Sequence, residues 1–287
     1  MSEFILKNMN TSIDSYGQLI SLYAGNRELW FDKMDISIEN WFAANLCSPL
    51  GGILDKLQRN ANTILFSKIT DKTQAILQKN GFLSHFGYEN IYDNNNTTIR
   101  YLKLKPGDSR YFHQYIADSL LNRPELPIMT NILKKKIAES IYEIFVNAQL
   151  HSESEFIYTC GQFYPAKHKI EFTISDTGIG FRTKINRWSG KNLSAVQAIR
   201  WALKDGHSTK ENISGGIGLA ILRDFIIMNK GKLQIISNNG FFQEDELGSK
   251  TYLFNDDFPG TIINMQFKTD DPAVYAIMQE DNIVDLF

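Results

Sequence analysis

Residues 169–180, which read KIEFTISDTGIG, decide how the C-terminal half of the sequence folds. Apolar and polar side chains alternate over residues 169–175, and this alternation predicts a strand with one buried face. A second alternating run at 156–163 is joined to it by Pro165-Ala166-Lys167-His168, which predicts an antiparallel hairpin with a longer loop. The strand leads directly into Asp176-Thr177-Gly178-Ile179-Gly180, where glycine permits a sharp turn.

Asp176, at the end of this predicted strand, has the chemistry of a ligand-binding carboxylate. An ionised carboxylate only accepts hydrogen bonds, so it can accept one from an exocyclic amine such as that of adenine. Gly178 and Gly180 carry no Cβ and let the backbone approach a flat base closely. An ordinary turn at the end of a strand is the alternative, since short glycine motifs are common there.

The longest predicted helix spans residues 131–151, with Thr130 as its N-cap. Polar residues recur every four positions and share one face: Glu139, Glu143, Asn147 and His151. The opposite face is apolar and is expected to pack on the sheet: Ile137, Ile141, Ile144 and Ala148. The polar face is either solvated or part of a site. An Asn oxygen suits a Mg²⁺ that already holds phosphate, and a Glu one turn earlier can orient or deprotonate the group that attacks a phosphate.

Two further segments favour phosphate and base binding. Ser214-Gly215-Gly216-Ile217-Gly218-Leu219 opens a predicted helix at 217–228, and the free N–H groups of a glycine-rich helix start can bind phosphate. Gly260-Thr261 leads into a predicted strand at 261–267, where the Thr hydroxyl can bond a base or a water. The alternatives are a plain glycine-rich loop and a threonine that only favours strand.

In this order and spacing, E-x-x-x-N-A at 143–148, DTGIG, GGIGL and G-T resemble the GHKL family, the histidine-kinase-like ATPases with a Bergerat-type nucleotide pocket, over residues 128–268. The resemblance implies that ATP and Mg²⁺ are the cofactors, that Asn147 holds the metal and that Glu143 is the catalytic base. It assigns nucleotide contacts to Asp176, Gly178, Gly180, Gly216, Gly218 and Thr261. It also implies that residues 181–214 form a mobile ATP lid. Within that lid, His207-Ser208-Thr209-Lys210 resembles a signature that places Lys210 near the γ-phosphate.

Three features refine the resemblance. Ser214 stands where the second glycine loop of the family usually begins with Gly, but the two inner glycines remain. Glu143 follows the hydrolysing members and the anti-sigma serine kinases, whereas many transmembrane histidine kinases carry Asn at this position. None of the histidines is followed by Asp or Glu, so a self-phosphorylating histidine kinase is disfavoured; His113, on a predicted helix, is the nearest option.

Residues 28–104 alternate between strand and helix patterns, which predicts a small α/β domain. The predicted strands and helices are, in order, 28–31, 40–57, 63–66, 72–78 and 97–104, of which 40–57 and 72–78 are helical. The region resembles STAS domains, the partners of anti-sigma kinases, through Asn62-Thr63-Ile64-Leu65-Phe66 before Ser67 and through residues 77–83. The Asp-Ser phosphoacceptor pattern of antagonist STAS proteins is absent, so phosphorylation of Ser67 is not predicted.

The clearest domain boundary is Lys105-Pro106-Gly107-Asp108. The predicted organisation is an N-terminal segment, a small α/β (STAS-like) domain, a GHKL ATP-binding domain and a C-terminal tail, at 1–25, 26–105, 106–270 and 271–287. Further elements are predicted as helices at 109–121 and 193–204 and as a strand at 232–236. Helices and antiparallel strands segregated in this way predict an α+β fold whose C-terminal domain is a two-layer α/β sandwich, a mixed sheet with helices on one face.

Composition excludes several classes of protein. The net charge of −2 provides no electrostatic basis for binding nucleic acid or an anionic membrane. Only two cysteines occur, Cys47 and Cys160, so a disulfide framework is not expected and a reducing cytoplasm is the natural compartment. The sequence begins without the pattern of a signal peptide, and no run approaches the roughly 18 apolar residues of a transmembrane helix.

These observations lead to one preferred function and one alternative. The preferred function is an ATP-binding regulatory protein that needs Mg²⁺, either an ATPase or a serine/threonine protein kinase of the anti-sigma type, acting on a regulatory protein partner. The alternative is a non-catalytic ATP-gated switch whose lid exposes or hides an interface. Accidental motifs in an unrelated α/β protein are a third reading, and a homodimer is left open.

Overall fold

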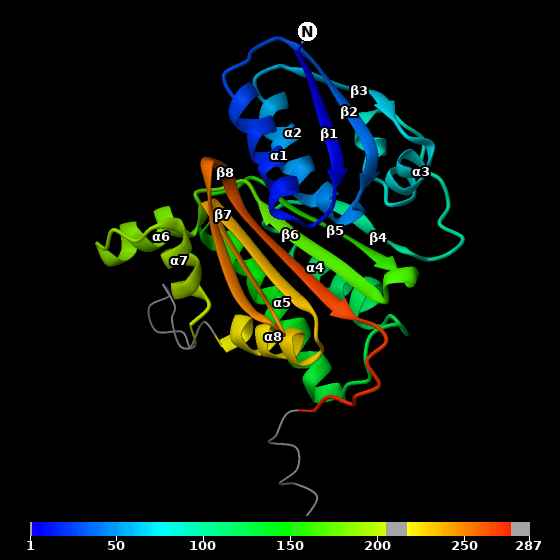
Figure 1. Cartoon of the computed structure of the whole chain (residues 1–287), viewed down its shortest axis with the longest axis vertical. Helices are drawn as coiled ribbons and strands as arrows, with labels where there is room; N and C mark the ends of the chain where they lie inside the picture. Colours follow the sequence, from blue (N-terminus) through cyan, green and yellow to red (C-terminus); the bar gives the residue numbers. More distant parts are fainter. Residues whose placement is uncertain (1, 152, 205–216, 277–287) are drawn as a thin grey trace, which may run out of the picture.

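The structure is a computed structural model that describes residues 2–151, 153–204 and 217–276. Two sheets organise it (Figure 1): a three-stranded sheet in the order β1-β2-β3 and a five-stranded sheet in the order β4-β5-β6-β8-β7. The smaller sheet belongs to the N-terminal part of the chain. The larger sheet forms the body of the molecule, and the candidate site lies on one of its faces.

The N-terminal sheet is parallel and is built from β1 (Ser2–Met9), β2 (Lys33–Phe42) and β3 (Thr63–Ile69). Parallel neighbours need a crossover, and α1 (Ile13–Asn26) and α2 (Cys47–Gln58) provide the two crossovers. Side chains on alternate positions of the strands pack with these helices in one buried cluster, including Met34, Ile36, Ile38, Ile64 and Phe66. The shorter α3 (Asp71–Lys79) follows β3.

The N-terminal part differs from the sequence-based expectation at three places. No element was predicted for residues 1–25, but residues 2–25 contain β1 and most of α1, and β1 completes the parallel sheet. The predicted strand at 28–31 is instead the turn before β2, because Phe31 has a left-handed backbone with φ of 57°. The predicted helix at 40–57 begins only at Cys47, since β2 runs on to Phe42.

The five-stranded sheet comprises β4 (Thr98–Leu104), β5 (Ile157–Tyr164), β6 (Lys169–Asp176), β7 (Lys232–Asp245) and β8 (Gly248–Lys268). All its pairings are antiparallel, so the prediction of a mixed sheet is wrong for this sheet. The reason is that β5–β6 and β7–β8 are direct hairpins and β8 returns against β6. The strands predicted at 232–236 and 261–267 are only parts of the long β7–β8 hairpin.

The edge strand β4 belongs to a different sheet from the one that the predicted domain boundaries imply. It lies before the predicted boundary at residue 105, yet it pairs with β5 and not with the N-terminal sheet. Strand β1, which lies in the predicted segment 1–25, belongs to the three-stranded sheet. The boundaries predicted at residues 26 and 105 therefore do not separate the strands of one sheet from those of the other. Local alternation predicted the strand correctly but could not show which sheet it joins.

One face of the five-stranded sheet is covered by α4 (Ser109–Ile116), α5 (Asn131–His151) and α8 (Ile217–Met228), whose apolar side chains share a cluster with the sheet. In Figure 1, α5 and α8 lie beneath the sheet and the N-terminal part lies above it. A π-helical turn (Ala117–Leu121) extends α4, so the helix predicted at 109–121 is present in two pieces. The helices predicted at 131–151 and 217–228 have the predicted bounds.

The other face of the sheet is covered by α1, α2 and the 3₁₀ turn at Ala44–Leu46. The contact is partly polar: Asn45 Nδ2 donates to Thr173 Oγ1 at 3.1 Å and to Asn264 Oδ1 at 3.0 Å. Tyr16 donates its hydroxyl to Gln234 at 3.1 Å. The sheet-and-helix sandwich predicted for the C-terminal half is therefore present, but the N-terminal part adds a third layer on its second face.

Candidate functional site

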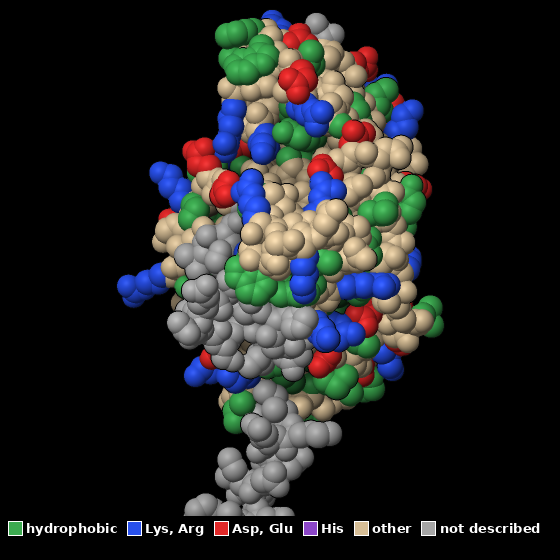
Figure 2. All heavy atoms as spheres, turned by 90° about the vertical axis from the view of Figure 1, so that its left-hand side faces the viewer, with side chains coloured by type: hydrophobic (Ala, Val, Ile, Leu, Met, Phe, Trp, Pro, Cys, Tyr) green, Lys and Arg blue, Asp and Glu red, His purple; other side chains and the backbone are tan. Residues whose placement is uncertain are grey.

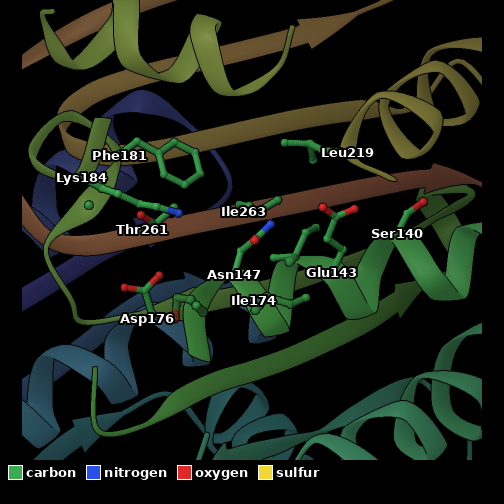
Figure 3. A pocket seen from close by; sticks show the side chains of 14 residues that line it. Ser140, Glu143, Asn147, Ile174, Asp176, Phe181, Lys184, Leu219, Thr261 and Ile263 are labelled. Carbon is green, nitrogen blue, oxygen red and sulfur yellow. The ribbon is translucent and has the colours of Figure 1, made fainter. Parts of the chain in front are cut away.

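A hollow lies between α5 and the five-stranded sheet and encloses about 60 Å³ of free space. Its lining comes from α5, β6, α6 (Gly180–Ser189), α8 and β8 (Figure 3). Five of the nine residues predicted for the site line it: Glu143, Asn147, Asp176, Gly180 and Thr261. They come from three separate stretches of sequence, so the fold brings together motifs that were recognised independently.

Helix α5 supplies the residues proposed for metal and catalysis. Its start is fixed by Thr130, whose Oγ1 accepts the N–H of Leu133 at 3.3 Å. Glu143 and Asn147 line the hollow, but Glu139, of the same polar face, forms an exposed ion pair with Lys136 at 3.0 Å. The predicted polar face of α5 is therefore not uniform, because Glu139 lies in solvent whereas Glu143 and Asn147 face the site. The side chain of His151 lies outside the described part.

Asp176 is the last residue of β6 and lies opposite Thr261 of β8. Its carboxylate accepts the N–H of Gly178 at 2.9 Å and is only 6% exposed. Burial raises the pKa of Asp176 to about 7, and the Gly178 N–H and the charges of Lys56 and Lys184 oppose that rise. The side chain thus changes between carboxylate and carboxylic acid near neutral pH, and only the carboxylate is a pure acceptor.

The glycines at the edge of the hollow are required by their neighbours. Gly180 has φ of 73°, and a Cβ there would meet Asn238 Oδ1 at 2.6 Å. Gly260 has φ of 145°, and a Cβ there would meet the carbonyl oxygen of Asp176 at 2.1 Å. The sequence predicted Gly180 because a flat ligand would approach the backbone closely. The structure gives a second reason, which is that the loop at Gly180 packs closely on β7.

Several lining residues were missed from the sequence: Ser140, Ile174, Phe181, Lys184, Leu219 and Ile263. Two of them follow from strand periodicity, because Ile174 lies two positions before Asp176 and Ile263 lies two positions after Thr261, on the same faces of their strands. Phe181 and Lys184 project from α6 toward the hollow in Figure 3. No helix was predicted at 180–189, so the sequence pattern did not indicate that Phe181 and Lys184 would line the hollow.

The predicted lid at 181–214 is described as far as residue 204. It contains most of α6 and all of α7 (Ala195–Ala202), which confirms the helix predicted near 193–204. Ile185, Ala198 and Ile199 are buried, so the described portion of the predicted lid has apolar packing of its own. On this side of the molecule hydrophobic side chains occur in small groups among Lys and Arg side chains (Figure 2).

Four of the predicted residues do not line the hollow in the described part of the chain: Gly178, Lys210, Gly216 and Gly218. Lys210 and Gly216, together with the segment His207–Lys210, lie outside the described residues. Gly218 lies in the first turn of α8, which begins at Ile217. Gly178 belongs to the Asp176 turn, where its N–H bonds the carboxylate, but it does not line the hollow. The contribution of the second loop to phosphate binding therefore stays a prediction.

The donor set suits a metal ion shared with a ligand. Across the described ranges, no cluster of three or more His, Cys, Asp and Glu side chains forms a site that the protein alone could complete. Asn147 offers one amide oxygen, with the Glu143 carboxylate one helical turn away on the same lining. Mg²⁺ typically takes one or two protein ligands and completes its shell with phosphate oxygens and water. Asn147 thus fits as the protein ligand of a Mg²⁺ that is bound with a nucleotide.

Comparison with known proteins adds no family to this description. No protein-family model matches the sequence, and no curated protein matches it either. Among the helices in the described part of the chain, none combines the length and apolarity needed to cross a bilayer.

Proposed function

We propose that this chain binds ATP together with Mg²⁺ in the hollow between α5 and the sheet, and acts as a Mg²⁺-dependent ATPase or as an anti-sigma-type serine/threonine protein kinase. The observation that carries the proposal is that Asp176, Asn147 and Glu143 line one hollow although α5 and β6 contribute them separately. An amine acceptor, a hard oxygen ligand and a carboxylate base are the groups that binding and cleaving ATP requires.

The end of the hollow near Asp176 is the part that suits the base. Ile174 and Ile263 offer apolar surface to the faces of a purine, while Asp176 accepts the hydrogen of its amine. Thr261, at the start of the inner part of β8, lies opposite Asp176 and holds its hydroxyl 3.0 Å from that of Ser237. Such a site combines apolar contact with one directional polar group, which selects adenine over bases without the amine.

The part of the hollow along α5 suits the phosphates. Asn147 would hold Mg²⁺, which in turn neutralises charge on the phosphate oxygens. Glu143 lies one turn earlier on the same helix and lines the hollow further from Asp176, as Figure 3 shows. From that position the carboxylate can accept the proton of a water or of a serine or threonine hydroxyl that attacks the terminal phosphate.

A non-catalytic ATP-gated switch is the second candidate, and one observation favours it. Helix α6 starts at Gly180, so Phe181 and Lys184 line the hollow while the rest of α6 and α7 extend to the surface. Movement of Phe181 and Lys184 on nucleotide binding would be passed directly to that surface. A protein partner that recognises α6 and α7 would then sense the nucleotide without any turnover.

The decisive experiment is incubation of the full chain with γ-labelled ATP and Mg²⁺, with and without the products of neighbouring genes. Free phosphate identifies an ATPase, a labelled protein identifies a kinase, and binding without either identifies a switch. Calorimetry of ATP with Asp176→Asn supplies the test of the site itself. The expected loss is roughly 1–3 kcal/mol, the scale of a hydrogen bond to a buried charge, and unchanged affinity would reject the assignment of Asp176.

A further inference from the structure

Helix α2 of the N-terminal part packs against the loop that carries Asp176. Three residues spaced by four, and therefore on one face of α2, make the contact: Ser48, Gly52 and Lys56. The Ser48 hydroxyl lies 2.8 Å from that of Ser175, and a Cβ at Gly52 would lie 2.7 Å from Thr177 Cγ2. Lys56 Nζ donates to the carbonyl oxygen of Thr177 at 3.0 Å.

We propose that Lys56 is a positioning residue of the nucleotide site, and that the N-terminal part thereby completes the pocket from behind the sheet. By holding the Thr177 carbonyl, Lys56 fixes the turn that presents Asp176, and its ammonium group favours the ionised carboxylate. The inference rests on the proposed function, because it assigns Asp176 to the amine of the nucleotide. It gives the N-terminal part a direct role in that site.

The surroundings of Lys56 suit this role. Its side chain is half-buried, and its Nζ lies 5.9 Å from the centre of the Tyr23 ring on α1. Burial and the nearby Arg59 lower the pKa of Lys56, whereas Asp176 acts in the opposite direction. Lys56 therefore interacts with Asp176 through the field of its charge and through the shared turn, and its hydrogen bond goes to the backbone.

The other charges around Asp176 come from three sides. Lys184 on α6 lowers the pKa of Asp176 in the same direction as Lys56, and Glu143 lines the hollow from α5. Before β5, two further carboxylates have partners of their own. Glu153 pairs with Arg187 at 3.2 Å and Glu155 pairs with Arg59 at 3.0 Å. Lys56 is thus the cation that the N-terminal part directs at the turn.

This arrangement predicts a pH dependence with a defined sign. The amine of adenine needs the ionised carboxylate, so affinity falls as the pH falls through the pKa of Asp176 in the free protein. Removing the Lys56 charge should raise that pKa by about one pH unit, the lower end of the effect of a nearby opposite charge. At pH 7 the ionised fraction would fall from about a half to about a tenth, so ATP affinity would fall about fivefold, with little change at pH 9.

The test compares Lys56→Met, Lys56→Gln and Lys56→Arg in the full chain. NMR of the Asp176 side-chain carboxyl in nucleotide-free protein measures its pKa, and calorimetry measures ATP dissociation constants from pH 6 to 9. Lys56→Met and Lys56→Gln should both raise the pKa and move the midpoint of binding upward, while Lys56→Arg should stay near wild type. Gln keeps a donor for the Thr177 carbonyl, so it separates loss of charge from loss of the hydrogen bond. Arg59→Met, directly after the end of the same helix and without a bond to Thr177, is the matched control and should leave the pKa of Asp176 in place.

Two results would overturn the inference. One is an unchanged Asp176 pKa in both neutral variants. The other is a uniform loss of affinity at every pH, which would show that Lys56 only supports the fold. If wild type binds no ATP while the carboxyl pKa still moves in Lys56→Met, the proposed function fails and the effect of Lys56 on Asp176 stands. If wild type binds ATP and the pKa does not move, the inference alone fails.

Discussion

Replacing Asp176 by Asn should stabilise the nucleotide-free protein at neutral pH. Burial raises the folded-state pKa of Asp176 to about 7 from an ordinary value of 3.8, so the folded protein favours the protonated side chain. A raised carboxyl pKa contributes stability that is fully present below pH 3.8 and is lost as the pH rises toward 7. Asn cannot ionise, and its oxygen can still accept the Gly178 N–H, so the variant avoids this loss.

The magnitude follows from the shift of about three pKa units, at about 1.4 kcal/mol for each unit. The free energy of unfolding of Asp176→Asn should exceed that of wild type by about 2 kcal/mol at pH 5 and by about 4 kcal/mol at pH 8, relative to their difference at pH 3. Urea unfolding at several pH values measures this. Because only the difference between the two proteins is used, the titration of all other groups cancels.

Two results would refute the reasoning. A difference in unfolding free energy that stays constant from pH 4 to 8 would show that Asp176 does not titrate in that range in the folded protein. A difference that ends its rise below pH 5 would show that the carboxylate is well solvated. Saturating Mg²⁺ and ATP should narrow the difference at neutral pH by roughly 1–3 kcal/mol, the expected loss of ATP affinity in the variant, since the ligand stabilises wild type more than the variant.

Four further outcomes are expected. Asn147→Ala should make ATP affinity nearly insensitive to Mg²⁺, and calorimetry with and without a chelator would contradict this if the two still differed as in wild type. Glu143→Ala should keep ATP affinity within about tenfold and lose about 10²–10⁴ in turnover, whereas Glu139→Ala on the exposed part of α5 should turn over normally; full activity of Glu143→Ala would remove the proposed base. Gly260→Ala should lower the free energy of unfolding by about 2 kcal/mol or more, because its Cβ would collide with the backbone of Asp176, and a denaturant midpoint equal to wild type would contradict that packing. Hydrogen exchange in α6 and α7 should slow when a non-hydrolysable ATP analogue is added, and equal rates in both states would reject the lid.

Elements with strong local patterns were predictable from the sequence. Helix α5 has the predicted bounds because apolar residues recur at helical spacing for five turns after the Thr130 cap. The β5–β6 hairpin was predictable because two alternating runs flank the four-residue loop at 165–168, which begins with Pro165. The approach of Glu143, Asn147 and Asp176 to one hollow was expected from the resemblance of their motifs to the GHKL family, whereas the helix pattern alone left a solvated polar face as an alternative.

Long-range pairing was not predictable in the same way. The alternation of β4 is satisfied by either sheet, and only its pairing with β5 decides between them. Thr173 and Asn264 belong to the polar faces of β6 and β8, a pattern typical of a solvated sheet, but both are buried beneath the N-terminal part. Asn45 satisfies both side chains from 128 and 219 positions away, which no local pattern reveals. The approach of Lys56 to Thr177 was missed for the same reason.

The packing of α1 and α2 on the large sheet affects the order in which the chain can fold. The apolar cluster around α1 and α2 includes Phe241, Phe254 and Phe258 of the β7–β8 hairpin, and Tyr16 reaches a partner 218 positions later. During synthesis the ribosome releases α1 long before those partners exist. The side of α1 and α2 that packs on the large sheet therefore stays uncovered until residues 234–258 have been synthesised. Contacts of such high sequence separation slow folding and prolong exposure to aggregation, so chaperone demand and sensitivity to C-terminal truncation should be high for this protein.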